Sequence, residues 1–222
     1  MNSVYRIFCP DRNRGGTAFG HRSGRIVTAE HIVRDCDPKK LQVVAPSGAT
    51  TGVIAVTSDP DLDLALITPS VGDFVKVPLG LTADSRFIMG AQVSTWGFPE
   101  GYGGLTPLLS VGYLAGVEEI RLKPNVVLRK WIINGAFNRG NSGGPVLETK
   151  TGTIVGVISS KLAPMPKELE LSLDNLEKNG SAEVKNIAKV LQYLRSQTQL
   201  VIGLATITAD LRIFLQKNGI EP

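Results

Sequence analysis

The chain has 222 residues, 42% of them hydrophobic, so it is long and apolar enough to bury a substantial core. Its 24 Lys and Arg against 20 Asp and Glu give a formal net charge of +4, too small a surplus to indicate a nucleic-acid-binding protein. The 24 Gly and 13 Pro, with few aromatic residues, argue against an all-helical bundle and favour short strands joined by tight turns.

The charge distribution and the cysteines restrict the ligands that we expect. The first forty residues hold eight basic and four acidic side chains, which we interpret as a solvated basic rim and not as a polyanion-binding site. Cys9 and Cys36 form neither a metal-binding motif nor a dense disulfide framework, so we expect no metal, no cofactor and no disulfide. Since no apolar run suits a signal peptide or a membrane span, we expect a soluble cytoplasmic protein without membrane or nucleic-acid partners.

Apolar stretches punctuated by Gly, Pro, Asn and Asp predict eleven strands in the first 160 residues. They are Val4–Phe8, Thr17–Phe19, Ile26–Ala29, Leu41–Ala45, Gly52–Thr57, Asp63–Thr68, Ala91–Trp96, Leu108–Leu114, Val126–Ile133, Val146–Glu148 and Ile154–Ser159. Many short strands at this spacing are typical of a sandwich or barrel, and not of alternating β and α units.

A helical period replaces this pattern after Pro164. Apolar residues at helical spacing predict an amphipathic helix with Ser181 as its N-cap; they are Val184, Ile187, Ala188, Leu191 and Leu194. The stretch Lys167 to Lys178 stays open, because three of its leucines fit a helix and a fourth fits only a period of two.

The C-terminal residues predict a strand at Leu200–Ile207 and a last helix capped by Thr208. We interpret 165–199 as an insertion into a single domain and not as a second domain. Because the apolar stripe of its helix must be covered, we expect that helix to dock on the C-terminal half of the same chain.

The most specific string is NRGNSGGPV, which centres on Ser142. A serine between glycines can sit on a tight turn with its hydroxyl exposed and with backbone N–H groups on one side. The amides of Gly140 and Ser142 could then stabilise negative charge that develops on a substrate. By itself, the string is equally compatible with an ordinary turn.

A nucleophilic serine needs a base and an orienting carboxylate. His31 follows the strand Ile26–Ala29, where a rigid element presents it, whereas His21 lies in an expected hairpin turn and is interpreted as solvent-exposed. Asp61 and Asp63 precede a leucine-rich run and are expected on one face of a strand, opposite the leucines. An ionisable side chain at the start of such an apolar run needs a polar partner if it is buried. We expect one of the two aspartates to be that buried residue and the other to be an exposed turn residue.

These segments resemble the trypsin-like serine proteases of the chymotrypsin fold, and most closely the protease domain of the HtrA/Deg family. GTAFG followed by IVTAEHIV resembles the histidine segment of that family, DPDLDLALI the aspartate segment, and NRGNSGGPV the serine segment. The resemblance covers about residues 15–164 and 200–219. Within its motif, the family's aspartate directly precedes the L-A-L run, which assigns that role to Asp63.

The resemblance implies an all-β fold of two six-stranded antiparallel β-barrels with a helical insertion and a C-terminal helix. In one protease domain spanning 1–222, residues 1–80 would form the first barrel, 90–164 with 200–222 the second, and 165–199 the insertion. It also implies a serine endopeptidase that acts on protein or peptide substrates without metal or cofactor. The catalytic residues would be His31, Asp63 and Ser142, and the oxyanion hole would be formed by Gly140, Asn141 and Ser142.

The same resemblance places the primary specificity pocket. The residue six positions before the nucleophile, Ala136, would lie at its base, and Phe137 and Ile158 would narrow its walls. Because no acid occupies the base, we expect small or medium apolar side chains before the scissile bond.

Two departures from the family leave alternatives open. The chain ends without the PDZ domain that usually follows, so PDZ-directed peptide recognition is expected to be absent. The 165–199 insertion is longer than the family's loop and is interpreted as a passive surface helix, a docking element for a regulatory protein, a substrate gate or a cleavable tether. A protease-fold scaffold and a zymogen-like effector remain alternatives to the active enzyme, and no residue decides the oligomeric state.

Overall fold

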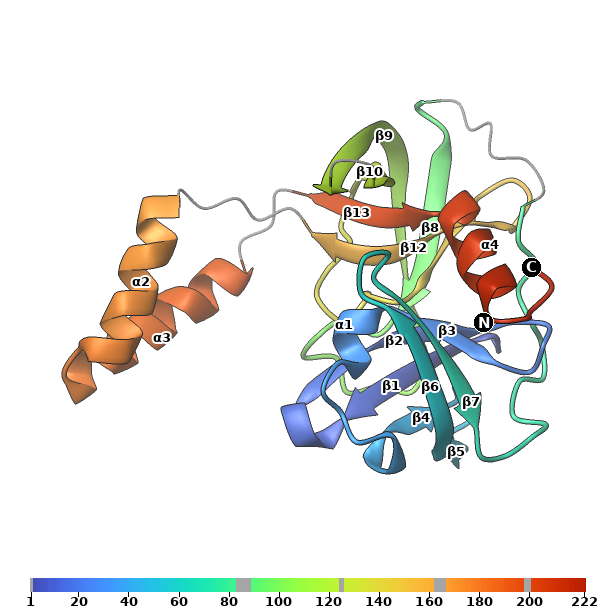
Figure 1. Cartoon of the computed structure of the whole chain (residues 1–222), viewed down its shortest axis with the longest axis horizontal. Coiled ribbons are helices and arrows are strands. Elements are labelled where there is room, and N and C mark those ends of the chain that lie inside the picture. The colour runs from blue at the N-terminus through green and yellow to red at the C-terminus, as the bar shows by residue number, and fades with distance from the viewer. Residues whose placement is uncertain (1, 83–88, 124–125, 162–166, 198–200) are drawn as a thin grey trace.

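The computed structural model describes residues 2–82, 89–123, 126–161, 167–197 and 201–222 (Figure 1). Two antiparallel sheets account for most of the regular secondary structure and lie one above the other in that view. The predicted all-β, two-barrel fold is confirmed, with one closed barrel and one that is nearly closed.

The N-terminal half forms the nearly closed barrel, a seven-stranded sheet in the order β5-β4-β1-β2-β3-β7-β6, which has one strand more than the six expected. Its strands are β1 (Val4–Cys9), β2 (Arg14–Gly20), β3 (Ile26–Thr28), β4 (Gln42–Val44), β5 (Thr50–Thr51), β6 (Val53–Asp59) and β7 (Leu64–Pro69). The short helix α1 (Glu30–Val33) follows β3, and single 3₁₀ turns lie at Pro10–Arg12 and Pro38–Lys40.

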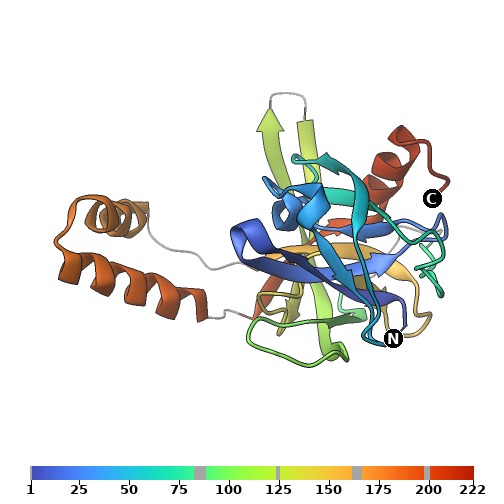
Figure 2. The ribbon, with the colours of Figure 1, turned by 90° about the horizontal axis from the view of Figure 1, so that it is seen from below.

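The C-terminal half closes into a six-stranded barrel in the order β10-β13-β12-β11-β8-β9. Its strands are β8 (Gln92–Gly97), β9 (Leu108–Lys123), β10 (Val126–Gly135), β11 (Pro145–Glu148), β12 (Ile154–Lys161) and β13 (Ile202–Ile207). β9 continues well past its predicted end at Leu114, and the β9–β10 hairpin projects beyond the barrel (Figure 2). The prediction stopped early because the sequence beyond Val117 is mostly charged.

One hydrophobic cluster joins the two halves and fixes their relative position. From the N-terminal sheet it takes Phe19 and Val27, and from the barrel Ile154 and Val157. The last helix, α4 (Thr208–Lys217), covers this seam with its buried Leu211, Phe214 and Leu215. Thr208 was expected to cap α4, but Ile207 holds the cap position and the Thr208 hydroxyl donates to the Ile154 carbonyl instead (3.3 Å).

The insertion between β12 and β13 is a hairpin of two helices, α2 (Lys167–Asn179) and α3 (Ala182–Gln197). The stretch left open is therefore helical, and Ser181 caps α3 by accepting from the Val184 N–H (3.4 Å). The expectation that α3 docks on the barrel is wrong. It packs against α2, and the hairpin projects away from both sheets (Figures 1 and 2).

α2 is the neighbour that α3 contacts, although Leu169, Leu171 and Leu176 of α2 are themselves 41–61% exposed. Ala188 is fully buried in the hairpin. The stripe formed by Ile187, Leu191 and Leu194 nevertheless stays about half exposed. In the described part of the chain, no helix combines the length and the apolar character needed to cross a membrane.

Cys9 and Cys36 form a disulfide, contrary to expectation, with their Cα atoms 6.0 Å apart. Cys9 ends β1, and Cys36 lies in the loop that follows α1. The sequence could not reveal the pair, because 27 positions separate the two residues and only the packing of α1 beside β1 brings them together.

Candidate active site

His31 and Asp63 meet on the inner side of the N-terminal sheet. His31 lies in α1, directly after β3, and Asp63 directly precedes β7. Because β3 pairs with β7, the two residues are brought together from positions 32 apart in the chain. The Nδ1 atom of His31 lies 2.9 Å from Oδ1 and 3.0 Å from Oδ2 of Asp63, and the His31 backbone N–H also donates to Oδ1 (3.0 Å).

Asp63 is held by the C-terminal barrel as well. The Ser159 hydroxyl, on β12, donates to Asp63 Oδ2 over 2.6 Å. Burial by itself would raise the pKa of the Asp63 carboxyl, but the hydrogen bonds from His31 and Ser159 outweigh it and hold that pKa below its ordinary value. The carboxylate therefore stays ionised and accepts hydrogen bonds from both halves of the molecule.

Asp61 and Asp63 lie in the turn before β7, so the expectation of two aspartates on one strand face is wrong. Asp63 has a left-handed backbone with a φ of 56°, which turns it out of the alternation of a strand. Asp61 is exposed. Of the two, Asp63 is the one that contacts His31.

Ser142 lies in the loop between β10 and β11, which packs against the N-terminal sheet. Its carbonyl accepts from the Thr17 N–H of β2 (2.9 Å), and the neighbouring Gly143 N–H donates to the Ile158 carbonyl of β12 (2.7 Å). Gly143 has a φ of 81°, and a Cβ atom there would lie 2.2 Å from the Thr17 carbonyl oxygen and 2.7 Å from the Ala29 nitrogen. Only glycine fits, and this close approach brings the serine loop to the segment that leads into His31.

The Ser142 hydroxyl makes no hydrogen bond with His31 in the described residues. Hydrogen bonds between catalytic groups are often long or poorly aligned before substrate binds and tighten in the complex, so this geometry is compatible with a serine–histidine pair.

The backbone before Ser142 is fixed by contacts to other segments. Gly140 has a φ of 89°, and a Cβ atom on it would lie 2.3 Å from the Phe98 carbonyl oxygen, so this position also requires glycine. The Glu100 N–H donates to the Arg139 carbonyl (2.7 Å), and the Thr17 hydroxyl donates to the Gly140 carbonyl (2.7 Å). The Arg139 carbonyl and the Gly140 N–H belong to the same trans peptide group and point to opposite sides of it. Because the carbonyl faces Glu100, the Gly140 N–H points away from Glu100.

The backbone amides of Gly140 and Ser142, on either side of Asn141, are among the loop amides for which the described residues offer no acceptor. The Asn141 N–H instead donates to the Asn138 carbonyl (3.1 Å). Asn141 was expected to supply a third amide, and this expectation is not met because its N–H is already used to close the turn.

The three residues assigned to the specificity pocket are not equally accessible. Ala136 is exposed. Phe137 and Ile158 are buried in the core of the C-terminal barrel, and the ring of Phe137 lies against Gly203 of β13. Phe137 therefore belongs to the barrel core, whereas Ala136 is accessible from outside.

His21 is buried and not exposed, contrary to the sequence-based interpretation. Only 1% of its surface is accessible, its Nδ1 lies 3.0 Å from Ser23 Oγ, and burial lowers its pKa. It lines a hollow of about 200 Å³ together with Arg22 and Pro222.

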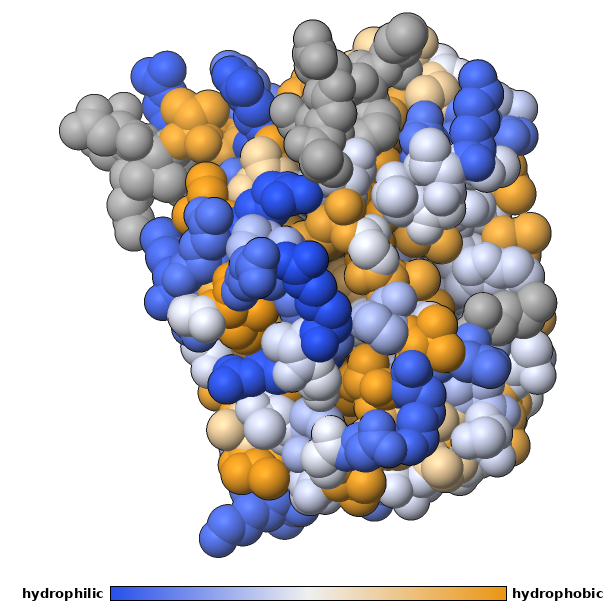
Figure 3. All heavy atoms as spheres, turned by 90° about the vertical axis from the view of Figure 1, so that its right-hand side faces the viewer, coloured by the Kyte–Doolittle hydropathy of each residue, from blue (hydrophilic) through white to orange (hydrophobic). Residues whose placement is uncertain are grey.

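The face seen in Figure 3 has hydrophilic and hydrophobic residues interspersed.

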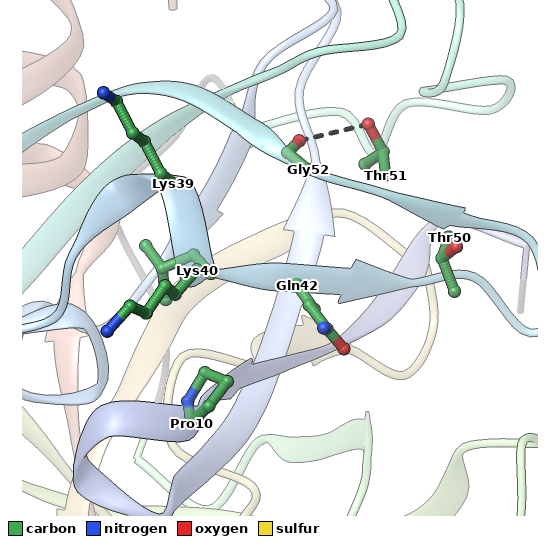
Figure 4. Close-up of a pocket in the computed structure, with 8 residues that line it drawn as sticks. Pro10, Lys39, Lys40, Gln42, Thr50, Thr51 and Gly52 are labelled. Atoms are coloured by element: carbon green, nitrogen blue, oxygen red, sulfur yellow. Dashed lines mark hydrogen bonds between the residues drawn. The ribbon is translucent and has the colours of Figure 1, made fainter.

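A second hollow, of about 530 Å³, lies at the edge of the N-terminal sheet (Figure 4). Pro10, Lys39, Lys40 and Thr50 are among the residues that line it, and neither His31, Asp63 nor Ser142 takes part. The Lys40 ammonium is paired with Asp11 (2.9 Å). In the described residues, no group of three or more His, Cys, Asp or Glu side chains could hold a metal ion.

Two residues of the site escaped the sequence interpretation. Ser159 and Thr17 were placed in strands, but no local motif indicates that the Ser159 hydroxyl reaches Asp63 and the Thr17 hydroxyl reaches Gly140. Both contacts connect the two halves of the molecule, so they depend on how the halves pack and not on a local motif.

Comparison with known proteins agrees with this geometry. The family model of the trypsin-like peptidase domain matches residues 16–157, well over half of the chain. Protease Do-like 1, chloroplastic, of Arabidopsis thaliana is 27% identical over 146 residues, which cover 64% of this chain and 32% of that protein.

Two bacterial relatives extend this similarity. The probable periplasmic serine endoprotease DegP-like of Brucella suis is 28% identical over 195 residues, covering 82% of this chain and 36% of that protein. The protein of the same name from Bartonella henselae is 31% identical over 154 residues, covering 68% and 28% respectively. The chain thus spans about a third of the length of these relatives.

Solved structures share the fold. The active form of the Rv3671c protease of M. tuberculosis has a TM-score of 0.69 at 19% identity, with 100% of this chain and 82% of that chain covered. The inactive form of the same protease has a TM-score of 0.68 at 18% identity, with 97% of this chain and 88% of that chain covered.

Proposed function

The chain belongs to the trypsin-like peptidase domain family and is homologous to the DegP/HtrA proteases, and from this premise we propose that it is a serine endopeptidase. Its substrates would be proteins or peptides, cleaved through an acyl-enzyme. The observation that carries the proposal is the contact of His31 Nδ1 with both oxygens of Asp63, beside the loop that bears Ser142.

The chemistry assigns one role to each residue. His31 takes the proton from the Ser142 hydroxyl through its free ring nitrogen, Nε2, and the hydroxyl oxygen attacks the peptide carbonyl. Asp63 accepts from Nδ1, which keeps the proton there in the resting state and leaves Nε2 as the acceptor. Asp63 also stabilises the imidazolium that forms. His31 then returns the proton to the leaving amine, and water hydrolyses the acyl-enzyme.

The amides of Gly140 and Ser142 would hold the oxyanion of the tetrahedral intermediate. Preorganised donors of this kind act strongly because they need no reorientation when charge develops. Among the described residues neither N–H group has an acceptor, and both belong to a loop that Thr17 and Glu100 fix in place. The pocket beside this loop would accept small or medium apolar side chains, because Ala136 carries no charge.

A fluorophosphonate probe tests this function without knowledge of the substrate. The enzyme is expected to be labelled at Ser142, with the adduct located by mass spectrometry of the proteolytic peptides. Ser142→Ala should not react, whereas Ser47→Ala, which alters an exposed serine in another turn, should react like the wild type. Wild-type protein that is folded yet inert to the probe would overturn the proposal.

An effector that requires activation is the second candidate, favoured by the missing hydrogen bond between Ser142 and His31. Such a protein would label slowly alone and faster once a partner or a cleavage ordered the loop. A protease-fold scaffold would remain unlabelled under every condition. The rate of labelling, measured before and after limited proteolysis, separates these outcomes from the constitutive enzyme.

The cytoplasmic location remains a prediction from the sequence. The Cys9–Cys36 disulfide argues instead for an oxidising compartment, because disulfides are rare where thiols are kept reduced. The α2–α3 hairpin also remains a candidate docking element for a regulatory protein.

A further inference from the structure

A lysine is buried at the seam between the two halves. Lys130, on β10, is only 6% exposed, and its ammonium donates to the Leu62 carbonyl (3.0 Å) and to the Thr206 hydroxyl (2.6 Å). The Thr206 hydroxyl donates in turn to the same Leu62 carbonyl (2.9 Å). Two donors of the barrel therefore converge on one carbonyl oxygen of the N-terminal half.

The two donors reach Leu62 as a pair because of the strand register. Lys130 and Thr206 are directly opposite each other on the neighbouring strands β10 and β13. Leu62 belongs to the turn that precedes β7, and its side chain is buried in the cluster that joins the two halves. Its own N–H donates to Asp59 (3.1 Å), so the peptide groups on both sides of Leu62 are held.

The clamped carbonyl belongs to the peptide bond that joins Leu62 to Asp63. Asp63 has a φ of 56°, a conformation that few residues other than glycine adopt. Such a conformation persists only where the surroundings over-determine it. The hydrogen bonds to the Leu62 carbonyl fix the orientation of the peptide group before Asp63. The pairing of β7 with β3 fixes the backbone after Asp63. The direction of the Asp63 carboxylate follows from these restraints.

The charges around Lys130 fit this arrangement. Burial lowers the pKa of Lys130, while Asp63 and Asp210, the latter on α4, act in the opposite direction and favour the ammonium. Burial raises the pKa of Asp210, the nearby charges of Lys130 and Arg129 lower it, and the charge of Asp59 raises it. A buried cation is costly unless it is paired and hydrogen-bonded, and here the acceptors lie next to the carboxylate that orients His31.

We propose that Lys130, with Thr206, is a positioning residue that holds the Leu62–Asp63 peptide and thereby aims the Asp63 carboxylate at His31. The inference rests on the proposed function, in which that carboxylate orients the base. The hydrogen bonds of Lys130 go to Leu62 and Thr206, which lie outside the serine loop.

The test is a double-mutant cycle read by the inactivation kinetics of Ser142 with a fluorophosphonate. Lys130→Met should lower the maximal rate of inactivation by about tenfold, with little change in the probe concentration that gives half of that rate. Asp63→Asn should lower it far more. In the Asp63→Asn background, Lys130→Met should have almost no further effect, because residues that act through one group are non-additive. If Lys130→Met lowers the rate by the same factor in the wild-type and in the Asp63→Asn background, the proposal is overturned.

Thr206→Val provides a second variant should Lys130→Met fold poorly, and it should lower the rate in the same direction by a smaller factor. Its matched control is Thr208→Val, a buried threonine two positions on, whose hydroxyl bonds to Ile154 and not to Leu62. This control should change the melting temperature without changing the rate. Equal rate losses in the two threonine variants would indicate a structural role only.

The far-downfield proton resonance of the His31 Nδ1–Asp63 hydrogen bond gives a readout that needs no activity. We expect it to shift or broaden in Lys130→Met and to stay unchanged in Thr208→Val. If the wild type does not react with the probe, the proposed function fails and this resonance alone decides the positioning role. An unaltered resonance in folded Lys130→Met overturns it.

Discussion

The Ser159 hydroxyl lies 2.6 Å from Oδ2 of Asp63, so a strand of the C-terminal barrel holds a carboxylate that belongs to the N-terminal sheet. The same carboxylate accepts from the ring and the backbone of His31. Its three donors come from two halves of the molecule, and the orientation of His31 therefore depends on the packing of those halves.

Ser159→Ala should reduce the rate at which a fluorophosphonate labels Ser142 by roughly ten- to a hundredfold, because a hydrogen bond to a charged group contributes about 1.5–3 kcal/mol. The control is Ser94→Ala, another largely buried serine in the same barrel. It should leave the rate unchanged. Equal rates in Ser159→Ala and in the wild type would mean that the Ser159 hydroxyl does not help to orient the Asp63 carboxylate.

Asp63→Asn should lower the labelling rate by several orders of magnitude, on the order of 10⁴, because an amide in this place favours the wrong imidazole tautomer. Asp61→Asn should have a small effect, since Asp61 is exposed and the His31 ring is held by Asp63. The comparison is made on proteins with matching circular dichroism spectra. A larger loss in Asp61→Asn would show that the aspartate is misassigned.

The lowered pKa of Asp63 predicts how stability depends on pH. A carboxyl whose folded pKa is depressed stabilises the native state above its unfolded pKa of about 3.9, and this contribution disappears as pH falls through the folded value. Denaturant unfolding should therefore show a difference between wild type and Asp63→Asn at about pH 5 that shrinks below pH 4. A difference that grows on acidification would contradict the direction of the shift.

Local patterns were sufficient to predict most of the fold. Every predicted strand is present, because alternating or continuous apolar residues bounded by turn residues specify a strand almost regardless of its neighbours. The GNSGG string was equally informative, since Gly140 and Gly143 have positive φ values and lie too close to backbone atoms for any side chain. Motifs of this kind record a local steric requirement.

Contacts between distant segments were not predictable in the same way. Neither the spacing of Cys9 and Cys36 nor the sequence around Lys130 indicates that each residue meets its partner across a sheet edge or a barrel seam. The placement of α3 failed for a related reason. An apolar stripe shows that a helix needs a neighbour, but it does not identify whether that neighbour is the barrel, α2 or another molecule.

The Cys9–Cys36 disulfide, which was not expected from the sequence, should make the stability of the protein sensitive to reductants. Closing a loop of this length constrains the unfolded chain by about 3–4 kcal/mol in the chain-entropy treatment. A Cys9→Ser, Cys36→Ser double variant should therefore unfold at lower denaturant concentration than the oxidised wild type. A reductant should lower the midpoint of the wild type and leave that of the variant unchanged. Equal midpoints for the oxidised wild type and the variant would contradict the bond.

The exposed α2–α3 hairpin should be the first part of the chain that an added protease cuts. Lys178 and Lys189 are exposed on it, and its main contacts are between its own two helices. Trypsin is therefore expected to cleave within 167–197 while the two pieces stay associated, because β12 and β13 pair with each other and β13 also pairs with β10. The nicked protein should elute as one species and still label at Ser142.

Two controls accompany this cleavage experiment. The Ser142→Ala variant excludes self-cleavage. The Lys178→Gln, Lys189→Gln variant lacks two of the sites at which the added trypsin can cut the hairpin. Loss of labelling on nicking would show that the hairpin supports the serine loop. Resistance of the wild type to trypsin would show that a partner or a second copy covers the stripe of Ile187, Leu191 and Leu194, because exposed helices joined by a short turn would otherwise be cut.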